Sequence, residues 1–145
     1  MIEIQFMGAH HINEVYQIEL DTFAIPWTRG NFEKELVNPI AIYIVALEQN
    51  KVIGYAGMWH VVNEGHIINV AVKEEKRRKG VGTLLIKKLT EIAIEKEMTG
   101  LTLEVRISNT AGQRLYHKFG FKAEGIRRKY YSDTGEDAII MWRNL

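Results

Sequence analysis

Hydrophobic residues recur along this chain with two spacings, one typical of strands and the other of helices. Short apolar runs, alternating as in 2–6 or nearly continuous as in 40–47, indicate strands, because successive strand side chains point to opposite faces. Apolar residues three or four positions apart, as in 81–93, indicate a helix. The predicted strands are 2–6, 40–47, 52–62, 67–72, 101–107, 121–123 and 138–142. The predicted helices are 10–22, 28–37, 80–96 and 109–120, with Thr28 and Asn109 as N-caps.

The connections between these elements predict a mixed sheet. Turn residues at Gln49-Asn50 and at Asn63-Glu64-Gly65 join three consecutive strands as hairpins, so the middle of the sheet should be antiparallel. The helix 80–96 connects two strands, which predicts a parallel, right-handed crossover. The last two strands should close the sheet as a hairpin. We therefore predict an α/β fold with an α+β mixed sheet, in one domain of residues 1–145, because this length suits a single core.

The loop that precedes the helix 80–96 carries the clearest chemical signal. It reads Arg77-Arg78-Lys79-Gly80-Val81-Gly82 and is followed by Thr83. Glycines beside a helix N-terminus let the backbone approach a ligand, and the unpaired N–H groups and dipole of the first turn attract an anion. The pattern lacks the G-x-x-x-x-G-K-[ST] of a Walker loop, and Leu85 replaces the third glycine of a Rossmann fingerprint. The loop is either a pyrophosphate site or a basic, solvated turn.

Composition narrows the possible functions. A net charge of +1 argues against a general nucleic-acid binder, so no nucleic-acid partner is expected. The absence of cysteine excludes disulfides, thiolate nucleophiles and cysteine metal sites, and a cytoplasmic location is the default expectation. No apolar run reaches membrane length and no signal-peptide pattern is present, so no membrane partner is expected. The five histidines lack metal-binding spacing; we interpret them as ordinary residues and expect no metal.

The loop and a series of further motifs resemble the GNAT acetyltransferase superfamily. Within it, the chain is most similar to the bacterial ribosomal-protein-alanine N-acetyltransferases and their archaeal N-terminal acetyltransferase relatives. The element order β-α-α-β-β-β-α-β-α-β-β resembles the fold of that superfamily, and R-x-x-G-x-G resembles its coenzyme A pyrophosphate loop. The motifs that recur in order are Pro26-Trp27, Arg77–Gly82, Leu103–Arg106, Asn109, Leu115-Tyr116, Gly120-Phe121, Arg127–Tyr131 and Glu136-Asp137-Ala138.

The resemblance implies an enzyme that transfers acetyl from acetyl-CoA to the N-terminal α-amine of a protein, without a metal, and the expected acceptor is a ribosomal protein. Its implied acetyl-CoA-binding residues are Val70, Ala71, Val72, Arg77, Arg78, Lys79, Gly80, Val81, Gly82, Thr83 and Asn109. Its implied acceptor-binding residues are Pro26, Trp27, Tyr130 and Tyr131, the last two in a hairpin loop. We expect a monomer or a weak homodimer.

Glu104 is the implied general base, acting through water. Its strand places Glu104, Thr102 and Arg106 on one face and the apolar residues on the other. By itself, this pattern favours a surface glutamate paired with Arg106, because surface carboxylates are common. The strand environment could raise the pKa of Glu104, whereas Arg106 would lower it.

Tyr116 is the implied acid that protonates the coenzyme A thiolate. It lies two helical turns after Asn109 on the same face, where it could instead be a core residue beside Leu115 and Phe119. Asn109 could serve as an N-cap, a coenzyme A contact or both.

The absence of cysteine and of a G-x-S-x-G motif favours direct attack by the acceptor amine in a ternary complex over an acyl-enzyme. Two other functions remain open from the sequence. The same scaffold could acetylate a lysine side chain or a small-molecule amine, or it could bind coenzyme A as an inactive regulator.

Overall fold

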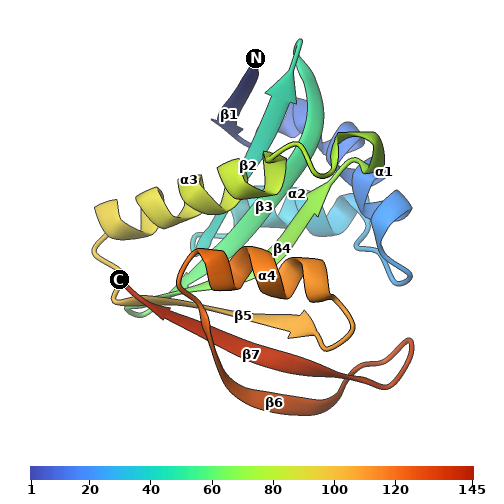
Figure 1. The fold of residues 1–145 in the computed structure, drawn as a ribbon. Coiled ribbons are helices and arrows are strands. Elements are labelled where there is room, and N and C mark those ends of the chain that lie inside the picture. Colours follow the sequence, from blue (N-terminus) through green and yellow to red (C-terminus); the bar gives the residue numbers. More distant parts are fainter.

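The computed structural model describes all 145 residues of the chain. Seven strands form one mixed sheet in the order β1-β2-β3-β4-β5-β7-β6 (Figure 1). The strands are β1 (Ile2–Phe6), β2 (Ala41–Glu48), β3 (Lys51–Val61), β4 (Glu64–Val72), β5 (Gly100–Arg106), β6 (Lys122–Tyr131) and β7 (Glu136–Asn144). The helices are α1 (Ile12–Thr22), α2 (Arg29–Val37), α3 (Val81–Glu95) and α4 (Thr110–Lys118), with 3₁₀ turns at Ala9–His11 and Glu74–Lys76. None of the helices is long and apolar enough to span a membrane.

Helices cover both faces of the sheet, and two hydrophobic clusters fill the interfaces. α3 packs on one face and α1 with α2 on the other (Figure 1). β2 shows how the strands serve both clusters, because Ile44 and Ala46 join the α3 cluster while Tyr43, Val45 and Leu47 join the α1–α2 cluster. A strand buried on both faces reads as a continuous apolar run, which explains the pattern at 40–47.

The predicted mixed topology is confirmed, including the parallel pairing of β4 with β5. The pairing is short, however, because Glu64, Gly65 and His66 are the only β4 residues opposite β5. Both strands continue beyond this point, so they diverge, and β5 pairs instead with β7 along its whole length. α4 lies over the resulting gap (Figure 1). The two predicted N-caps are also present: Thr28 Oγ1 accepts from the Asn31 N–H at 3.1 Å, and Asn109 Oδ1 accepts from the Gly112 N–H at 2.9 Å.

The prediction for the final hairpin is wrong in extent. Strands were expected at 121–123 and 138–142, with Arg127–Tyr131 in the loop between them, but β6 runs to Tyr131. β6 is an edge strand whose side chains are exposed along nearly its entire length, so no apolar periodicity marks it. Its pairing with β7 depends on backbone hydrogen bonds and is interrupted after Ala123 and after Arg127.

A β-bulge at Ile68 changes which face β4 presents. Gly57 of β3 lies opposite Asn69, but the next β3 residue, Met58, lies opposite Ile67, which leaves Ile68 without a partner. One extra residue reverses the alternation of side chains. Ile67 therefore packs in the α3 cluster, whereas Ala71, four positions later, packs in the α1–α2 cluster.

A row of three residues crosses the sheet beside this bulge. Tyr43 of β2 lies opposite Gly57 of β3, which lies opposite Asn69 of β4. The Tyr43 ring occupies the space over Gly57 and its hydroxyl donates to Asn69 Oδ1 at 2.7 Å. Any side chain at position 57 would collide with that ring.

We predict that Gly57→Ala lowers the free energy of unfolding by about 2–4 kcal/mol, because the new methyl group overlaps a buried ring that cannot move freely. Chemical denaturation measures the change. Gly30→Ala is the matched control: its methyl group would meet only Thr28 Oγ1, at 3.7 Å, and lies within α2, where alanine is favoured. Equal stabilities of the Gly57 variant and wild type would contradict the packing described.

Candidate active site

The basic loop between β4 and α3 contains a left-handed backbone conformation, which favours glycine. Gly80 is the N-cap of α3 and has a φ of +82°, a left-handed conformation that glycine adopts without strain. The Arg77 side chain forms two hydrogen bonds that hold the loop in place. Its Nε–H donates to the Val72 carbonyl at 3.0 Å, and a terminal nitrogen donates to Thr22 Oγ1 at 3.4 Å. The Arg77 side chain thus links the ends of β4 and α1.

A cavity of about 480 Å³ opens in front of this loop. It lies between the N-terminal ends of α3 and α4, so the positive ends of two helix dipoles are near it. The lining residues are Val72, Lys76, Arg77, Arg78, Gly80, Val81, Gly82, Thr83, Asn109, Ala111, Gly112 and Leu115. Of the residues expected in the loop, Lys79 alone does not line the cavity. Lys76 does, although the sequence did not indicate it, and it forms an ion pair with Glu48 at 2.6 Å. We call this space the basic cavity.

A second cavity, of about 350 Å³, occupies the gap between β4 and β5. We call it the gap cavity. Its lining residues are Thr22, Phe23, Ile67, Ile68, Asn69, Val70, Leu103, Glu104, Val105, Arg106, Asn109, Tyr116 and Tyr131. Asn109 lines both cavities, so they adjoin. The structure therefore brings Glu104, the implied general base, and Tyr116, the implied acid, to one cavity beside the basic loop.

Glu104 is held by two basic side chains, neither of which is Arg106. The His66 Nε2–H donates to Glu104 Oε1 at 2.7 Å, and Arg127 Nε–H donates to Oε2 at 3.2 Å. The expected pairing with Arg106 is wrong. The hydrogen bond from His66 and the nearby charges of His66 and Arg127 hold the pKa of Glu104 below its ordinary value, although partial burial opposes them. An environment that raises this pKa, also considered from the sequence, is therefore contradicted. Glu104 is ionised at neutral pH.

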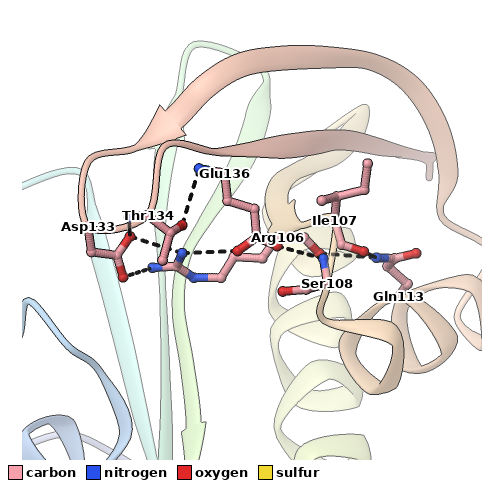
Figure 2. Close-up of polar contacts among 7 residues, drawn as sticks. All are labelled: Arg106, Ile107, Ser108, Gln113, Asp133, Thr134 and Glu136. Carbon is pink, nitrogen blue, oxygen red and sulfur yellow. Dashed lines mark hydrogen bonds and ion pairs between the residues drawn. The ribbon is translucent and has the colours of Figure 1, made fainter.

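Arg106 instead anchors the β6–β7 turn. Its guanidinium donates to both carboxylate oxygens of Asp133, at 3.0 and 2.8 Å, and to Glu136 at 3.4 Å (Figure 2). Glu136 also accepts from the Ser108 N–H at 2.7 Å. The same guanidinium lies 4.0 Å from the centre of the Tyr131 ring. Arg106 therefore fixes Tyr131 at the edge of the gap cavity. The position of Arg106 two residues after Glu104 in the sequence does not indicate this role.

Tyr116 enters the gap cavity from α4 and is half buried. Its ring packs against Phe121 with 5.8 Å between ring centres. Burial raises its pKa to about 12, and nearby Tyr131 adds to the shift. The phenol consequently keeps its proton at neutral pH and is available as a donor. Core packing and a role in the cavity, which the sequence left as alternatives, are compatible here.

Three of the four expected acceptor-binding residues lie outside both cavities. The Trp27 N–H donates to Glu19 at 2.9 Å, and the Trp27 ring packs on Phe32. Glu19 is buried, accepts also from the Tyr55 hydroxyl, and has a raised pKa because of that burial. Pro26 precedes Trp27 in the same segment, and Tyr130 is exposed on β6. Only Tyr131 lines the gap cavity.

Several cavity residues were not found from the sequence. Thr22 and Phe23 come from the end of α1 and reach the gap cavity only because the chain folds back there. His66 resembles the other histidines in sequence, and only the short parallel pairing of β4 with β5 places it beside Glu104. Among the expected pantetheine-contacting residues, Val70 and Val72 line a cavity, whereas the Ala71 side chain is buried in the α1–α2 cluster.

Comparison with known proteins identifies the family. Residues 12–121 match the sequence model of the "Acetyltransferase (GNAT) family". The chain belongs to the GNAT family. It is 43% identical over 140 residues to a putative [ribosomal protein bS18]-alanine N-acetyltransferase of Bacillus subtilis, covering 96% of this chain and 93% of that protein. The protein is an acetyl-CoA-dependent N-acetyltransferase, and the resemblance stated from the motifs is confirmed.

Solved structures show the same GNAT fold. The ribosomal-protein-S18-alanine N-acetyltransferase from Escherichia coli has a TM-score of 0.92 and 31% identity, with 99% of this chain and 94% of that chain covered. The PaiA N-acetyltransferase from Thermoplasma acidophilum, solved in complex with coenzyme A, has a TM-score of 0.85 and covers 100% and 99% of the two chains. At 18% identity the second likeness shows the fold alone. The expected GNAT fold is therefore confirmed.

We predict that the basic cavity binds the coenzyme A pyrophosphate. Gly82→Leu should raise the acetyl-CoA dissociation constant strongly, because a bulky side chain enters the cavity. Arg78→Ala should weaken binding by ~1–3 kcal/mol if it removes one charge-assisted hydrogen bond. Wild-type affinity should fall with added salt. Calorimetric titration measures all three effects. Lys79→Ala is the matched control, because Lys79 does not line the cavity; unchanged affinity in both cavity variants would remove this assignment.

Proposed function

We propose that this GNAT enzyme acetylates the N-terminal α-amine of a protein, and that the protein is ribosomal. The observation that carries the proposal is the convergence of Glu104 and Tyr116 on the gap cavity, which adjoins the basic cavity at Asn109. The names of the Bacillus subtilis and Escherichia coli relatives support the choice of acceptor. In this proposal residues 1–145 act as one acetyltransferase domain.

Acetyl-CoA would extend from the basic cavity into the gap cavity. The loop and the two helix N-termini carry the positive potential that a pyrophosphate requires. Beyond His66, the edge of β4 that faces β5 has no strand partner. Its free backbone groups can pair with the amides of the pantetheine arm in the manner of an added strand. The bulge at Ile68 turns the backbone at this edge, where an N–H could stabilise the oxyanion of the thioester.

The acceptor amine would attack the thioester carbon directly. A new C–N bond forms, the C–S bond breaks, and one proton must leave the nitrogen while one reaches the sulfur. Glu104 is ionised but its pKa is lowered, so it is too weak a base to take a proton from an ammonium efficiently by direct contact. The proton therefore passes through water, with Glu104 orienting and stabilising the relay.

Tyr116 would supply the proton that the sulfur needs. Burial has already raised the pKa of the Tyr116 phenol to about 12, well above the value near 8.5 of a thiol in water. The pKa of the thiol rises in the same cavity, because its anion also loses solvation there. The phenol can therefore stabilise the developing thiolate by a hydrogen bond before the proton moves.

Acceptor specificity tests the proposal. The protein is incubated with acetyl-CoA and, separately, an alanine-initiated peptide, the same peptide with an acetylated N-terminus and a free lysine, and a polyamine. Mass spectrometry with fragmentation locates the acetyl group. We expect acetylation of the free α-amine alone. Acetylation confined to lysine ε-amines or polyamines would overturn the proposal in favour of a side-chain or small-molecule acetyltransferase.

We predict that Tyr116→Phe lowers kcat by roughly 10²–10⁴-fold while the acetyl-CoA dissociation constant changes little, because only the hydroxyl is lost and the packing against Phe121 remains. Steady-state kinetics and calorimetric titration separate the two quantities. Tyr130→Phe is the matched control, because it removes a phenol outside the cavity. A fully active Tyr116→Phe enzyme would show that Tyr116 is only a packing residue.

We predict that Glu104→Gln lowers kcat/KM most near neutral pH and partly regains activity as pH rises. The lowered pKa keeps Glu104 ionised throughout the neutral range, so the wild-type profile there should follow the acceptor amine, whose pKa is near 8. At higher pH the amine is already neutral and needs no base. Profiles of kcat/KM against pH for both enzymes measure this. A loss that is uniform with pH would instead assign Glu104 to acceptor orientation.

A further inference from the structure

Asn69 is a buried polar residue that lines the gap cavity together with Glu104 and Tyr116, and burying a polar side chain costs free energy. It is only 8% exposed and lies immediately after the bulge at Ile68, which directs it to the α1–α2 face of the sheet. In β5, Leu103 and Val105 face α3. Glu104 lies between them, so its side chain points to the other face of the sheet, the one that Asn69 also faces. Both residues line the gap cavity. A buried carboxamide requires hydrogen-bond partners for both of its ends.

One end of the Asn69 amide is fixed by Tyr43. The Tyr43 hydroxyl donates to Asn69 Oδ1 at 2.7 Å, and this is the only hydrogen bond of that hydroxyl. Tyr43 is 5% exposed, so its O–H needs an acceptor, which the oxygen of the amide supplies and the nitrogen could not. Gly57 provides the space through which the ring reaches across β3. The Tyr43 hydroxyl on β2 therefore sets the orientation of the Asn69 amide, with Oδ1 toward Tyr43.

The other end of the amide has no partner within the protein. Nδ2 forms no hydrogen bond with the protein. Every fully buried polar side-chain atom of the chain does form one, so Nδ2 is not fully buried and water can reach it. The gap cavity is the space that Asn69 lines. Two N–H donors are thus available to whatever enters the cavity beside Glu104.

An amide N–H pairs with a carbonyl oxygen and cannot pair with an ammonium, which has only donors. In a peptide N-terminus, the first carbonyl carbon is bonded to the carbon that bears the amine. In a lysine side chain, a chain of methylenes separates the amine from the backbone, and a polyamine has no carbonyl. We propose that Asn69 Nδ2 donates to the first carbonyl oxygen of the acceptor and thereby selects α-amines. This inference rests on the proposed function.

Two acceptors that differ in their first peptide bond test the inference. One is an alanine-initiated peptide, and the other has that bond replaced by a trans-alkene of the same shape, which removes the carbonyl and the amide N–H. The loss of the N–H affects all enzyme variants alike, so a change in preference at Asn69 reports the carbonyl. We expect wild type to prefer the peptide by roughly 10-fold or more in kcat/KM, mainly through KM, because a lost partner leaves a polar group unpaired. Asn69→Asp and Asn69→Leu should reduce this preference to about 2-fold or less. Comparing the ratio between enzymes cancels the different basicities of the two amines.

Two further variants keep the test decisive if a change at Asn69 impairs folding. Tyr43→Phe lies outside the gap cavity and removes only the hydroxyl that orients the amide, so it should weaken the preference by roughly 2–5-fold and leave the activity on the alkene unchanged. Asn13→Asp, an exposed asparagine of α1, should retain the wild-type preference. Thermal unfolding and acetyl-CoA affinity verify that each variant is folded.

The outcomes separate this inference from the function on which it rests. If wild type acetylates the α-amine peptide but the Asn69 and Tyr43 variants keep its full preference over the alkene, Asn69 does not read the carbonyl and only this inference fails. If wild type acetylates lysine or polyamine nitrogens and not the α-amine, the proposed function and this inference both fail.

Discussion

The early end of the pairing between β4 and β5 is the constraint on which the site depends. Three residues of β4 lie opposite β5, and beyond His66 and Thr102 the two strands separate. A continuous pairing would close the gap cavity and use the backbone groups of β4 within the sheet. Separation is stable here because β5 pairs with β7 along its length and β4 with β3, so each strand keeps one complete partner. The gap connects the two faces of the sheet, which lets the phenol of α4 and the carboxylate of β5 line one cavity.

Charge is distributed around this gap in a way that suits two different substrates. Helix N-termini and arginines surround the basic cavity, where a dianionic group can bind. At the gap cavity, by contrast, each charged side chain has a partner of opposite sign: Glu104 is paired with Arg127 and also contacts His66, and Arg106 is paired with Asp133 and Glu136. These pairs also join β4, β5, β6 and the β6–β7 turn around the cavity. Their main effect is positional, because ion pairs that water can reach contribute little to stability.

The sequence predicts the fold well where burial imposes a pattern and poorly where it does not. The doubly buried run at 40–47 and the crossover through α3 are visible because hydrophobic spacing records both. The exposed edge strand β6 leaves no such record, so Arg127–Tyr131 was wrongly placed in a loop. The candidate site follows the same division. Local motifs indicate the basic loop, whereas the pairing of Glu104 with His66 and the bulge that turns Asn69 depend on strand register, which no single segment encodes.

A crystal structure with a bisubstrate conjugate, in which coenzyme A is joined through its sulfur to the N-terminus of an alanine-initiated peptide, tests the account most directly. The account predicts that the pyrophosphate lies against the loop at Arg77–Gly82 and that the pantetheine arm passes between β4 and β5. It also predicts that the sulfur faces the Tyr116 hydroxyl and that the peptide emerges on the face that carries Glu104. A conjugate bound outside the gap between β4 and β5, or a peptide on the α3 face, would contradict it.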